Sequence, residues 1–486
     1  MADRWPALAD PTALADPTAP LDVQVLDVPG PGNRCYLLSS NGMAVATDVP
    51  RDIDRLEHLL EADGLTLGAV LETHIHNDYL TGGLALARRH GAIYAVPAGP
   101  ELRYDALRVG DGEELHVGDL RLGVISTPGH TDAHAAYAVL PPGSSSAAAL
   151  LTGGSLLHGT TGRTDLLGRD RAEELARAQY WSVRRLPRLV PGTARLLPTH
   201  GFGGHCAAGS GTSMAVAGAP PTLADELERN PAFQLTEEAF VHDLLGRLDE
   251  YPHHYSRMGE LNRLGPAVPD LSVAAPASPA EVARRRDAGE TLVDLRPRAD
   301  FARAHVRGSI NLEGTGAMAD YVGWLVPRNH PLTLIGDGDA LAAAVRSLAR
   351  IGVDRPGSAG DDLSGLFAAA GRSSYPRRSF ADLEVEVGFG RPVVVDARSD
   401  LEWRTGHVAG AWHVPVQRLN RFPESSDRVW AYCRSGFRAA VLASLLDAHD
   451  QAVVLVDDDL DAVHATELPW CTGTDCGDVR CSEGTA

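Results

Sequence analysis

An internal repeat in the C-terminal part of the chain constrains its fold more than any other feature. The segment Val293–Arg296 recurs as Val395–Arg398, and the segment His305–Gly308 recurs as His407–Gly410. Each second copy lies 102 residues after the first, so the spacing between the two segments is kept. Self-similarity at a fixed period indicates duplication of one structural unit. The sequence therefore predicts two successive α/β units of about 100 residues each.

Length, charge and cysteine content narrow the class of protein. A chain of 486 residues is too long for one core and predicts about three domains. Its net charge of −20 argues against a nucleic-acid partner, because phosphate contacts need a basic surface. No apolar run approaches the roughly 20 residues that span a bilayer, and the start of the chain lacks the pattern of a secretory signal. Six cysteines are too few for a disulfide scaffold, so we expect a cytoplasmic protein without nucleic-acid or membrane partners.

The rest of the chain divides by composition. Its first residues repeat the segment ALADPT, which predicts a disordered tail. Short apolar runs then alternate with helix-like stretches, and a run rich in Pro, Ala and Ser follows, which is typical of a linker. The predicted boundaries are 1–20 for the tail, 21–255 for a front domain, 256–278 for the linker, 279–372 and 376–470 for the repeat units, and 471–486 for a cysteine-containing tail.

Three histidine motifs in the front domain each follow an expected strand. They are THIHNDY at 73–79, TPGHTD at 127–132 and PTHG at 198–201. Polar side chains just past strand ends converge when the strands share a sheet, and neutral imidazole is the commonest metal-ligating side chain. The pattern therefore predicts a metal site. The candidate ligands are His74, His76 and His130, with Asp78 and His200 orienting ligands or substrate.

These motifs resemble the metallo-β-lactamase superfamily over residues 21–255, and more narrowly its glyoxalase II and persulfide dioxygenase branch. The resemblance implies an α/β fold, an αββα sandwich with metal at the ends of its strands. In persulfide dioxygenases a single Fe(II) is held by two histidines, matched here by His74 and His130, and by an aspartate. Two departures matter: Tyr79 stands where the family has a histidine, and Gly154 stands where it has that aspartate. Since a two-metal site needs both missing groups, the resemblance implies one metal, mononuclear Fe(II) with zinc as the alternative.

Two further residues of the front domain have open roles. Arg163 lies in a GRTD segment that resembles one common in this branch, and we expect it to buttress the loops, with substrate contact as the alternative. Cys206 follows His200 by six residues. It is interpreted either as a small buried hydrophobic residue or as a thiol at the pocket mouth that relays sulfane sulfur.

The second repeat carries a cysteine between an expected strand, Arg428–Tyr432, and an expected helix, Ala439–Ala448. Backbone N–H groups and the positive end of a helix favour a nucleophilic thiolate at Cys433. The loop resembles the CxxGxR active loop of rhodanese sulfurtransferases, α/β domains with parallel sheets. That resemblance implies Cys433 as nucleophile, Arg438 as its charge partner, and a substrate-binding loop formed by Arg434, Ser435, Gly436 and Phe437. Phosphatases and arsenate reductases of related fold typically use one more loop residue, so six residues favour sulfur.

The first repeat and the C-terminal tail lack this chemistry. After its expected strand Leu332–Ile335 the first repeat has Gly-Asp-Gly-Asp and no cysteine, so it cannot form a persulfide and is predicted to be a spacer that docks its neighbours. In the tail, Cys471, Cys476 and Cys481 do not have the CxxC spacing of zinc or redox motifs. We expect exposed thiols there, with a role in resolving a persulfide as the alternative.

The combination resembles persulfide dioxygenase–sulfurtransferase fusions. It implies oxidation of a low-molecular-weight thiol persulfide to sulfite with O₂, coupled to sulfur transfer among persulfide, sulfite and thiosulfate, in sulfide and persulfide detoxification. Two other functions stay open: a zinc thioester hydrolase of glyoxalase II type, and a sulfur-carrier protein with a degenerate metal domain. Members of this branch often pair, which leaves a homodimer open.

Overall fold

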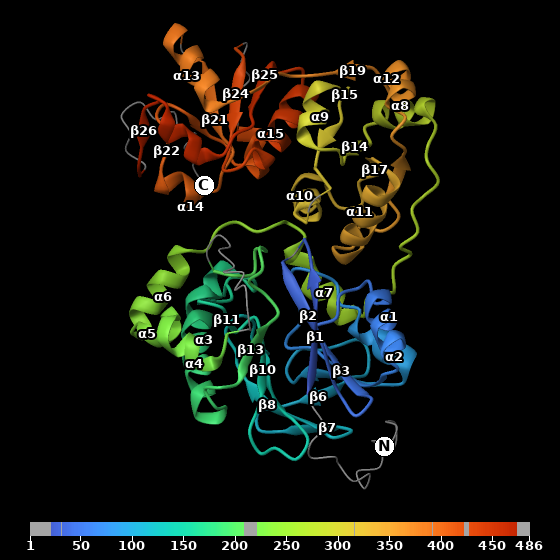
Figure 1. Ribbon diagram of the computed structural model, residues 1–486, viewed down its shortest axis with the longest axis vertical. Helices are drawn as coiled ribbons and strands as arrows, with labels where there is room; N and C mark the ends of the chain where they lie inside the picture. Colours follow the sequence, from blue (N-terminus) through green and yellow to red (C-terminus); the bar gives the residue numbers. More distant parts are fainter. Residues whose placement is uncertain are drawn as a thin grey trace. The chain divides into compact units, whose positions relative to one another are not determined.

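The computed structural model describes residues 21–30, 32–208, 221–314, 316–390, 392–421 and 427–473. The predicted N-terminal tail, Cys476 and Cys481 lie outside these residues. The chain forms two compact units (Figure 1). The first comprises Met1–Asp270 with the short segment Ala349–Gly352, and the second comprises Leu271–Leu348 with Val353–Ala486.

Two sheets form the centre of the first unit, and the histidine motifs follow their strands. One sheet has the order β1-β2-β3-β4-β5-β6. Its strands are β1 (Asp22–Val28), β2 (Asn33–Ser40), β3 (Met43–Thr47), β4 (Thr66–Leu71), β5 (Ile93–Pro97) and β6 (Leu107–Val109). The other has the order β13-β10-β9-β8-β7. Its strands are β7 (Glu114–Val117), β8 (Leu120–Ser126), β9 (Ala135–Leu140), β10 (Ala149–Gly153) and β13 (Arg195–Pro198). The short hairpin β11 (Leu156–Leu157) and β12 (Thr160–Thr161) follows β10.

The two sheets pack face to face and helices cover their outer faces. Tyr36 and Leu71 of the first sheet share one buried core with Tyr137 and Leu151 of the second. The outer face of the first sheet is covered by α1 (Asp54–Ala62) and α2 (Gly83–His90). Elsewhere in this unit are α3 (Ala172–Leu189), α4 (Leu223–Arg229), α5 (Pro231–Gln234), α6 (Glu237–Gly246) and α7 (Tyr255–Leu264). The expected αββα sandwich is confirmed.

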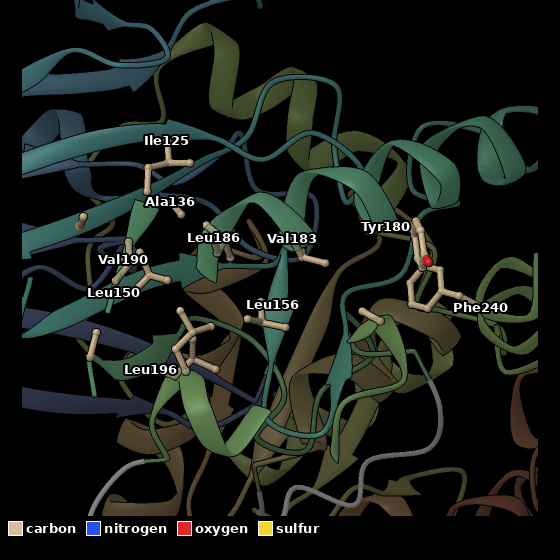
Figure 2. Packing of buried hydrophobic residues seen from close by; sticks show 14 of the residues in the cluster. Ile125, Ala136, Leu150, Leu156, Tyr180, Val183, Leu186, Val190, Leu196 and Phe240 are labelled. Carbon is tan, nitrogen blue, oxygen red and sulfur yellow. The ribbon is translucent and has the colours of Figure 1, made fainter. Parts of the chain in front are cut away.

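The core between the second sheet and its helices is shown in Figure 2. Val183 and Leu186 of α3 are buried in one cluster with Leu150 of β10. Tyr180 of α3 meets Phe240 of α6 with ring centroids 5.5 Å apart. The apolar side chains of α3 recur every three or four residues, which places them on one face of the helix. This packing fixes the second sheet and therefore the loops that leave its strand ends.

The second unit contains two sheets in which every neighbouring pair of strands is parallel. The first has the order β16-β14-β17-β18 and the second the order β20-β25-β24-β21-β23. The strands are β14 (Thr291–Asp294), β16 (Ile310–Asn311), β17 (Leu332–Ile335), β18 (Gly357–Ala359), β20 (Arg377–Arg378), β21 (Val393–Asp396), β23 (Trp412–His413), β24 (Val429–Tyr432) and β25 (Val453–Val456). Two small antiparallel pairs join β15 (His305–Val306) to β19 (Arg372–Ser373) and β22 (His407–Val408) to β26 (Trp470–Cys471).

Eight α-helices accompany these sheets in the described part of the second unit. They are α8 (Pro279–Asp287), α9 (Arg298–Arg303), α10 (Met318–Leu325), α11 (Gly338–Arg350), α12 (Leu363–Ala370), α13 (Phe380–Phe389), α14 (Asp400–Thr405) and α15 (Phe437–Ala448). Together with the parallel sheets they confirm the prediction of two α/β units.

The repeated sequence segments form the same corner in both copies. Arg296 pairs with Asp294 at 2.6 Å, as Arg398 does with Asp396. In the first copy the His305 ring stacks on Phe301 with centroids 3.8 Å apart, and its Nδ1–H donates to the Phe301 carbonyl at 2.9 Å. His407 and Trp403 repeat this arrangement at 3.3 Å and 3.0 Å. The repeated residues are therefore structural anchors of the fold.

The structure corrects two of the predicted boundaries. Residues expected in the linker form α7, because Met258 and Asn262 are buried against the first unit. The Asn262 side-chain amide donates to the carbonyls of His76 and Tyr79, both at 2.8 Å, so the helix supports the histidine loop. At the other end, Cys471 lies in β26 and is disulfide-bonded, so the expectation of an exposed thiol is wrong for this residue. Among the described residues, no helix has the length and apolar character that crossing a membrane requires.

Candidate functional site

Three histidines from three separate loops meet in the first unit. His74 follows β4, His130 follows β8 and His200 follows β13. All three are buried, and they offer ligand nitrogens that lie within 4.8 Å of one another. The Nε2 atoms of His74 and His200 are 3.2 Å apart. Because each histidine directly follows the end of a strand, imidazoles that are far apart in the sequence lie close together in the structure.

The hydrogen bonds of these rings define which nitrogen carries the proton. The Nδ1–H of His130 donates to the Arg163 carbonyl at 2.8 Å. The Nδ1–H of His200 donates to Asn33 Oδ1 at 2.7 Å. Asn33 presents that oxygen because its amide nitrogen donates to Asp78 Oδ2 at 2.6 Å. Both histidines therefore keep a free electron pair on Nε2.

His74 has the same arrangement. Its Nδ1 lies 2.9 Å from Thr73 Oγ1, and the Thr73 hydroxyl donates to Asp48 Oδ2 at 2.8 Å. The Thr73 oxygen is therefore the acceptor, and His74 also keeps its Nε2 electron pair. Two such pairs at 3.2 Å repel each other, and His130 Nε2 is buried without a partner among the described residues. A cation between them satisfies all three atoms.

The electrostatics of the site keep these imidazoles neutral. Burial lowers the pKa of His130 and that of His200 to about 3, and it lowers the pKa of His74 well below its ordinary value. Neutral imidazoles with Nδ1–H fixed by an acceptor are the usual form of histidine metal ligands. The residues present therefore fit one transition-metal ion held by His74, His130 and His200.

Neither of the two residues that depart from the family pattern offers a metal ligand. The Tyr79 hydroxyl donates to the Asp48 carbonyl at 2.9 Å, so it is committed to the backbone. At position 154 a Cβ atom would lie only 2.6 Å from His130 Nε2, and at position 162 it would lie 2.7 Å from His130 Nδ1. Gly154 and Gly162, here called the glycine cradle, leave the room that the imidazole fills. The His130 ring thus occupies the space of the missing carboxylate.

His76, predicted as a ligand, points into a different cluster. Its Nε2 lies 3.2 Å from both Asp48 Oδ1 and Glu72 Oε2. Burial alone lowers the pKa of His76, but these two carboxylates outweigh it and raise it to about 10. His76 Nδ1 is nevertheless buried without a hydrogen-bond partner among the described residues, and a second possible metal-ligand group joins His76, Asp78 and His200. His200, which was expected to orient other ligands, therefore belongs to both groups, and the ligand role of His76 stays a prediction.

Sequence reasoning missed His134, Asp48 and Glu72. His134 donates to Thr127 Oγ1 from Nδ1 at 2.8 Å and accepts from the Gly154 N–H at Nε2 at 3.0 Å, so it supports the loop and has no free nitrogen. The two carboxylates come directly after β3 and β4. Their position just after a strand, which identified the histidines as candidates, could have identified these two carboxylates as well.

Three other predicted residues lie around this centre. Asp78 accepts from Asn33 behind His200, which agrees with an orienting role. Cys206 is 1% exposed, and burial raises its pKa well above the ordinary value, so its thiol is not at an open pocket mouth. Arg163 is buried, pairs with Asp165 at 2.7 Å and donates to the Asp249 carbonyl at 2.6 Å. These contacts agree with the expected buttressing role.

The cysteine loop of the second unit lies between β24 and α15. Cys433 is buried directly after the strand, and Gly436 has φ +87° immediately before the helix. Among the described residues, no backbone N–H from Arg434 to Arg438 donates a hydrogen bond. These amides and the start of α15 are available to an anionic sulfur group at Cys433.

Two arginines flank this loop with different burial. The Arg438 side chain is 23% exposed and its Nη2 donates to Glu402 Oε1 at 2.8 Å. Burial opposes its charge, but the Glu402 hydrogen bond and the nearby Cys433 raise the pKa of Arg438 overall. Arg434 is 52% exposed and pairs with Asp461 at 3.1 Å. Arg438 is therefore the cation held at the cysteine, while Arg434 and Ser435 face outward.

Comparisons with known proteins agree with this division. The rhodanese-like domain family matches residues 278–357 and 379–466. The hydroxyacylglutathione hydrolase of Methylococcus capsulatus is 29% identical over 273 residues, which are 54% of this chain and 98% of that protein. The hydroxyacylglutathione hydrolase-like protein of Homo sapiens is 30% identical over 32% of this chain, and the match spans 50% of its length.

Two solved structures are also similar. A metallo-β-lactamase from Staphylococcus aureus has a TM-score of 0.63 at 24% identity, covering 70% of this chain and 99% of that one. ETHE1 from Myxococcus xanthus has a TM-score of 0.42 at 26% identity, covering 50% of this chain and 98% of that one. The chain therefore joins a metallo-β-lactamase and glyoxalase II-like fold to rhodanese-like domains.

Proposed function

We propose that the first unit is a mononuclear Fe(II) dioxygenase of low-molecular-weight persulfides and that Cys433 is a sulfurtransferase nucleophile. One observation carries the first half: three Nε2 electron pairs converge, while Tyr79 and Gly154 supply no ligand for a second ion. A binuclear hydrolytic site lacks the ligands expected at positions 79 and 154, whereas a single ion with three imidazoles keeps open positions.

The overall reaction of the first unit is balanced. One persulfide RSSH, one O₂ and one water give the thiol RSH, one sulfite and two protons, so the outer sulfur is oxidised and O₂ is reduced. When bound, Fe(II) with open positions supplies joint binding of a thiolate-type sulfur and O₂.

The chain's own residues hold the ligands for this chemistry. Asn33, Thr73 and the Arg163 carbonyl fix each Nδ1–H, which turns every Nε2 inward. Outer partners of this kind set ligand orientation and basicity. His76 lies within 3.2 Å of Asp48 and Glu72 beside the three histidines, and the two carboxylates raise its pKa.

In the second unit the transfer occurs in two steps. The Cys433 thiolate attacks the outer sulfur of thiosulfate, the S–S bond breaks, sulfite leaves, and a Cys433 persulfide remains. An acceptor thiolate then takes the outer sulfur and regenerates Cys433. Run in reverse, sulfite from the first unit takes sulfur from the Cys433 persulfide and leaves as thiosulfate. Arg438 and the loop amides stabilise the negative charge in both directions.

A zinc thioester hydrolase is the second candidate. The hydroxyacylglutathione hydrolase of Methylococcus capsulatus, matched over 98% of its length, favours it. A single zinc on three neutral histidines resembles sites that activate water. The metal and the co-substrate therefore distinguish the two candidates.

The test loads the full chain with Fe(II) or Zn(II) and measures O₂ uptake on glutathione persulfide and cleavage of a glutathione thioester. We expect uptake only with iron, lost in His130→Ala together with metal binding, and kept in Cys433→Ala. The matched control is His116→Ala, since that side chain is 56% exposed and distant from the ligand group. Thioester cleavage by the zinc form without uptake by the iron form would replace the dioxygenase by the hydrolase. Failure to retain any metal would favour the sulfur carrier.

A further inference from the structure

The first repeat contacts the cysteine loop of the second, although it has no cysteine of its own. Arg298 at the start of α9 donates from Nη2 to the Ser435 carbonyl at 3.0 Å. The Tyr321 ring of α10 meets the Phe437 ring edge-on, with centroids 5.2 Å apart. Both contacts fall on loop residues between Cys433 and Arg438.

The Arg298 contact is built into the loop. Its Nε pairs with Asp457 Oδ1 at 2.6 Å and its Nη1 with Glu313 Oε2 at 3.0 Å, so the guanidinium is fixed. A Cβ atom at Gly436 would lie 2.9 Å from Arg298 Nε and would also strike Asp457. The ion pair therefore packs against Gly436, which directly precedes α15.

Tyr321 packs against the cysteine loop through Phe437. The residue is 8% exposed, and its ring is held between Phe437 and Trp324. Its hydroxyl makes no hydrogen bond to any residue that the structure describes. Burial raises the pKa of Tyr321, and both Arg438 and Cys433 are close enough for their charges to act on it. A buried phenol thus packs against the first residue of α15, next in sequence to Arg438.

We propose that Tyr321 of the first repeat is a specificity-determining residue of the Cys433 site, whose hydroxyl binds the sulfonate oxygens of an oxygen-bearing sulfur donor. Arg298 is a positioning residue that holds the loop at Ser435. This inference rests on the proposed sulfurtransferase activity of Cys433. A thiosulfonate donor offers oxygens to the hydroxyl, whereas an alkyl persulfide offers none. The repeat without a cysteine therefore selects the donor class.

The experiment compares two donors, thiosulfate and glutathione persulfide, in sulfur transfer to cyanide by the full chain. In Tyr321→Phe we expect the KM for thiosulfate to rise about ten-fold, because a hydrogen bond to a charged group is lost. The kcat for thiosulfate and both constants for the persulfide stay within two-fold. Tyr375→Phe is the matched control, since its buried hydroxyl also lacks a partner among described residues and its ring packs on His305.

The outcomes separate this inference from the proposed function. No transfer by the wild type, or full transfer by Cys433→Ser, removes the sulfurtransferase itself. Transfer that needs Cys433 but has the same donor ratio in Tyr321→Phe as in the wild type overturns the role of Tyr321 alone. Equal losses with both donors overturn it as well, because packing damage does not discriminate between donors.

Discussion

The two repeats share their anchors and differ in one loop. In the first, β17 is followed by Gly336 and Asp337 before α11 begins, and the second residue of α11 is Asp339. In the second, four residues from Cys433 to Gly436 precede α15, and its second residue is Arg438. The Asp–Arg pair and the stacked histidine are present in both. The fold therefore does not depend on the chemistry, which lies in a few loop residues.

The largest effect is expected for Cys433→Ser. The hydroxyl is a far weaker nucleophile than the thiolate and forms no persulfide, so thiosulfate:cyanide transfer falls by about 10³-fold or more. Metal content and O₂ uptake stay at the wild-type level. Steady-state transfer assays with metal analysis check this. Residual transfer above a few per cent would place the nucleophile elsewhere.

Arg438→Met should lower kcat/KM for thiosulfate by about 10²-fold. The substitution keeps much of the side-chain volume but removes the cation held by Glu402 at the cysteine. Arg434→Met is the control, and its effect should stay below ten-fold because that side chain is half exposed. Equal losses in the two variants would contradict a larger catalytic role for Arg438 than for Arg434.

Gly436→Ala should destabilise the second unit by about 1–3 kcal/mol, because φ +87° is unfavourable for alanine and the methyl displaces the Arg298–Asp457 pair. Gly336→Ala should change stability by less than about 0.5 kcal/mol, since its nearest neighbour to an added Cβ is 3.4 Å away. Calorimetric unfolding of the full chain measures both. A Gly436→Ala variant as stable as the wild type would contradict close packing of the Arg298–Asp457 pair against Gly436.

The smallest effect is expected for Gly336→Cys in a Cys433→Ser background. The loop after β17 is two residues shorter than that after β24, and carboxylates flank it, so no anion site forms around the new thiol. Sulfur transfer should stay at the Cys433→Ser level. A measurable recovery would show that the cysteine alone, without loop length and Arg438, distinguishes the repeats.

The sequence predicted the architecture well because local patterns encode it. The strand expected at Leu332–Ile335 is β17, and the strand expected at Arg428–Tyr432 is β24. The repeat of Asp-x-Arg and His-Val-x-Gly located two α/β units, since these residues stabilise a local corner. The linker was placed too early because α7 is weakly apolar and is held by the buried Asn262, a contact that no local pattern shows.

The site was predictable only as a set of candidates. Strand ends identify which side chains can meet, but not which way a ring turns. His76 turns toward Asp48 and Glu72 because a buried imidazole between two carboxylates is satisfied there, and this depends on three separate segments. His200 takes the inward place because Asn33 accepts from its Nδ1–H. The assignments of metal ligands and of Cys433 therefore remain predictions until the variants are measured.

The glycine cradle limits how the first unit can be redesigned. An aspartate at position 154 cannot be added while His130 keeps its place, and a second ion also needs a ligand where Tyr79 now lies. An aspartate at position 154 displaces His130 before it adds a ligand, and a histidine at position 79 alone leaves the carboxylate missing, so neither single change builds the second site. Laboratory evolution toward a two-ion centre must vary positions 79, 130 and 154 together.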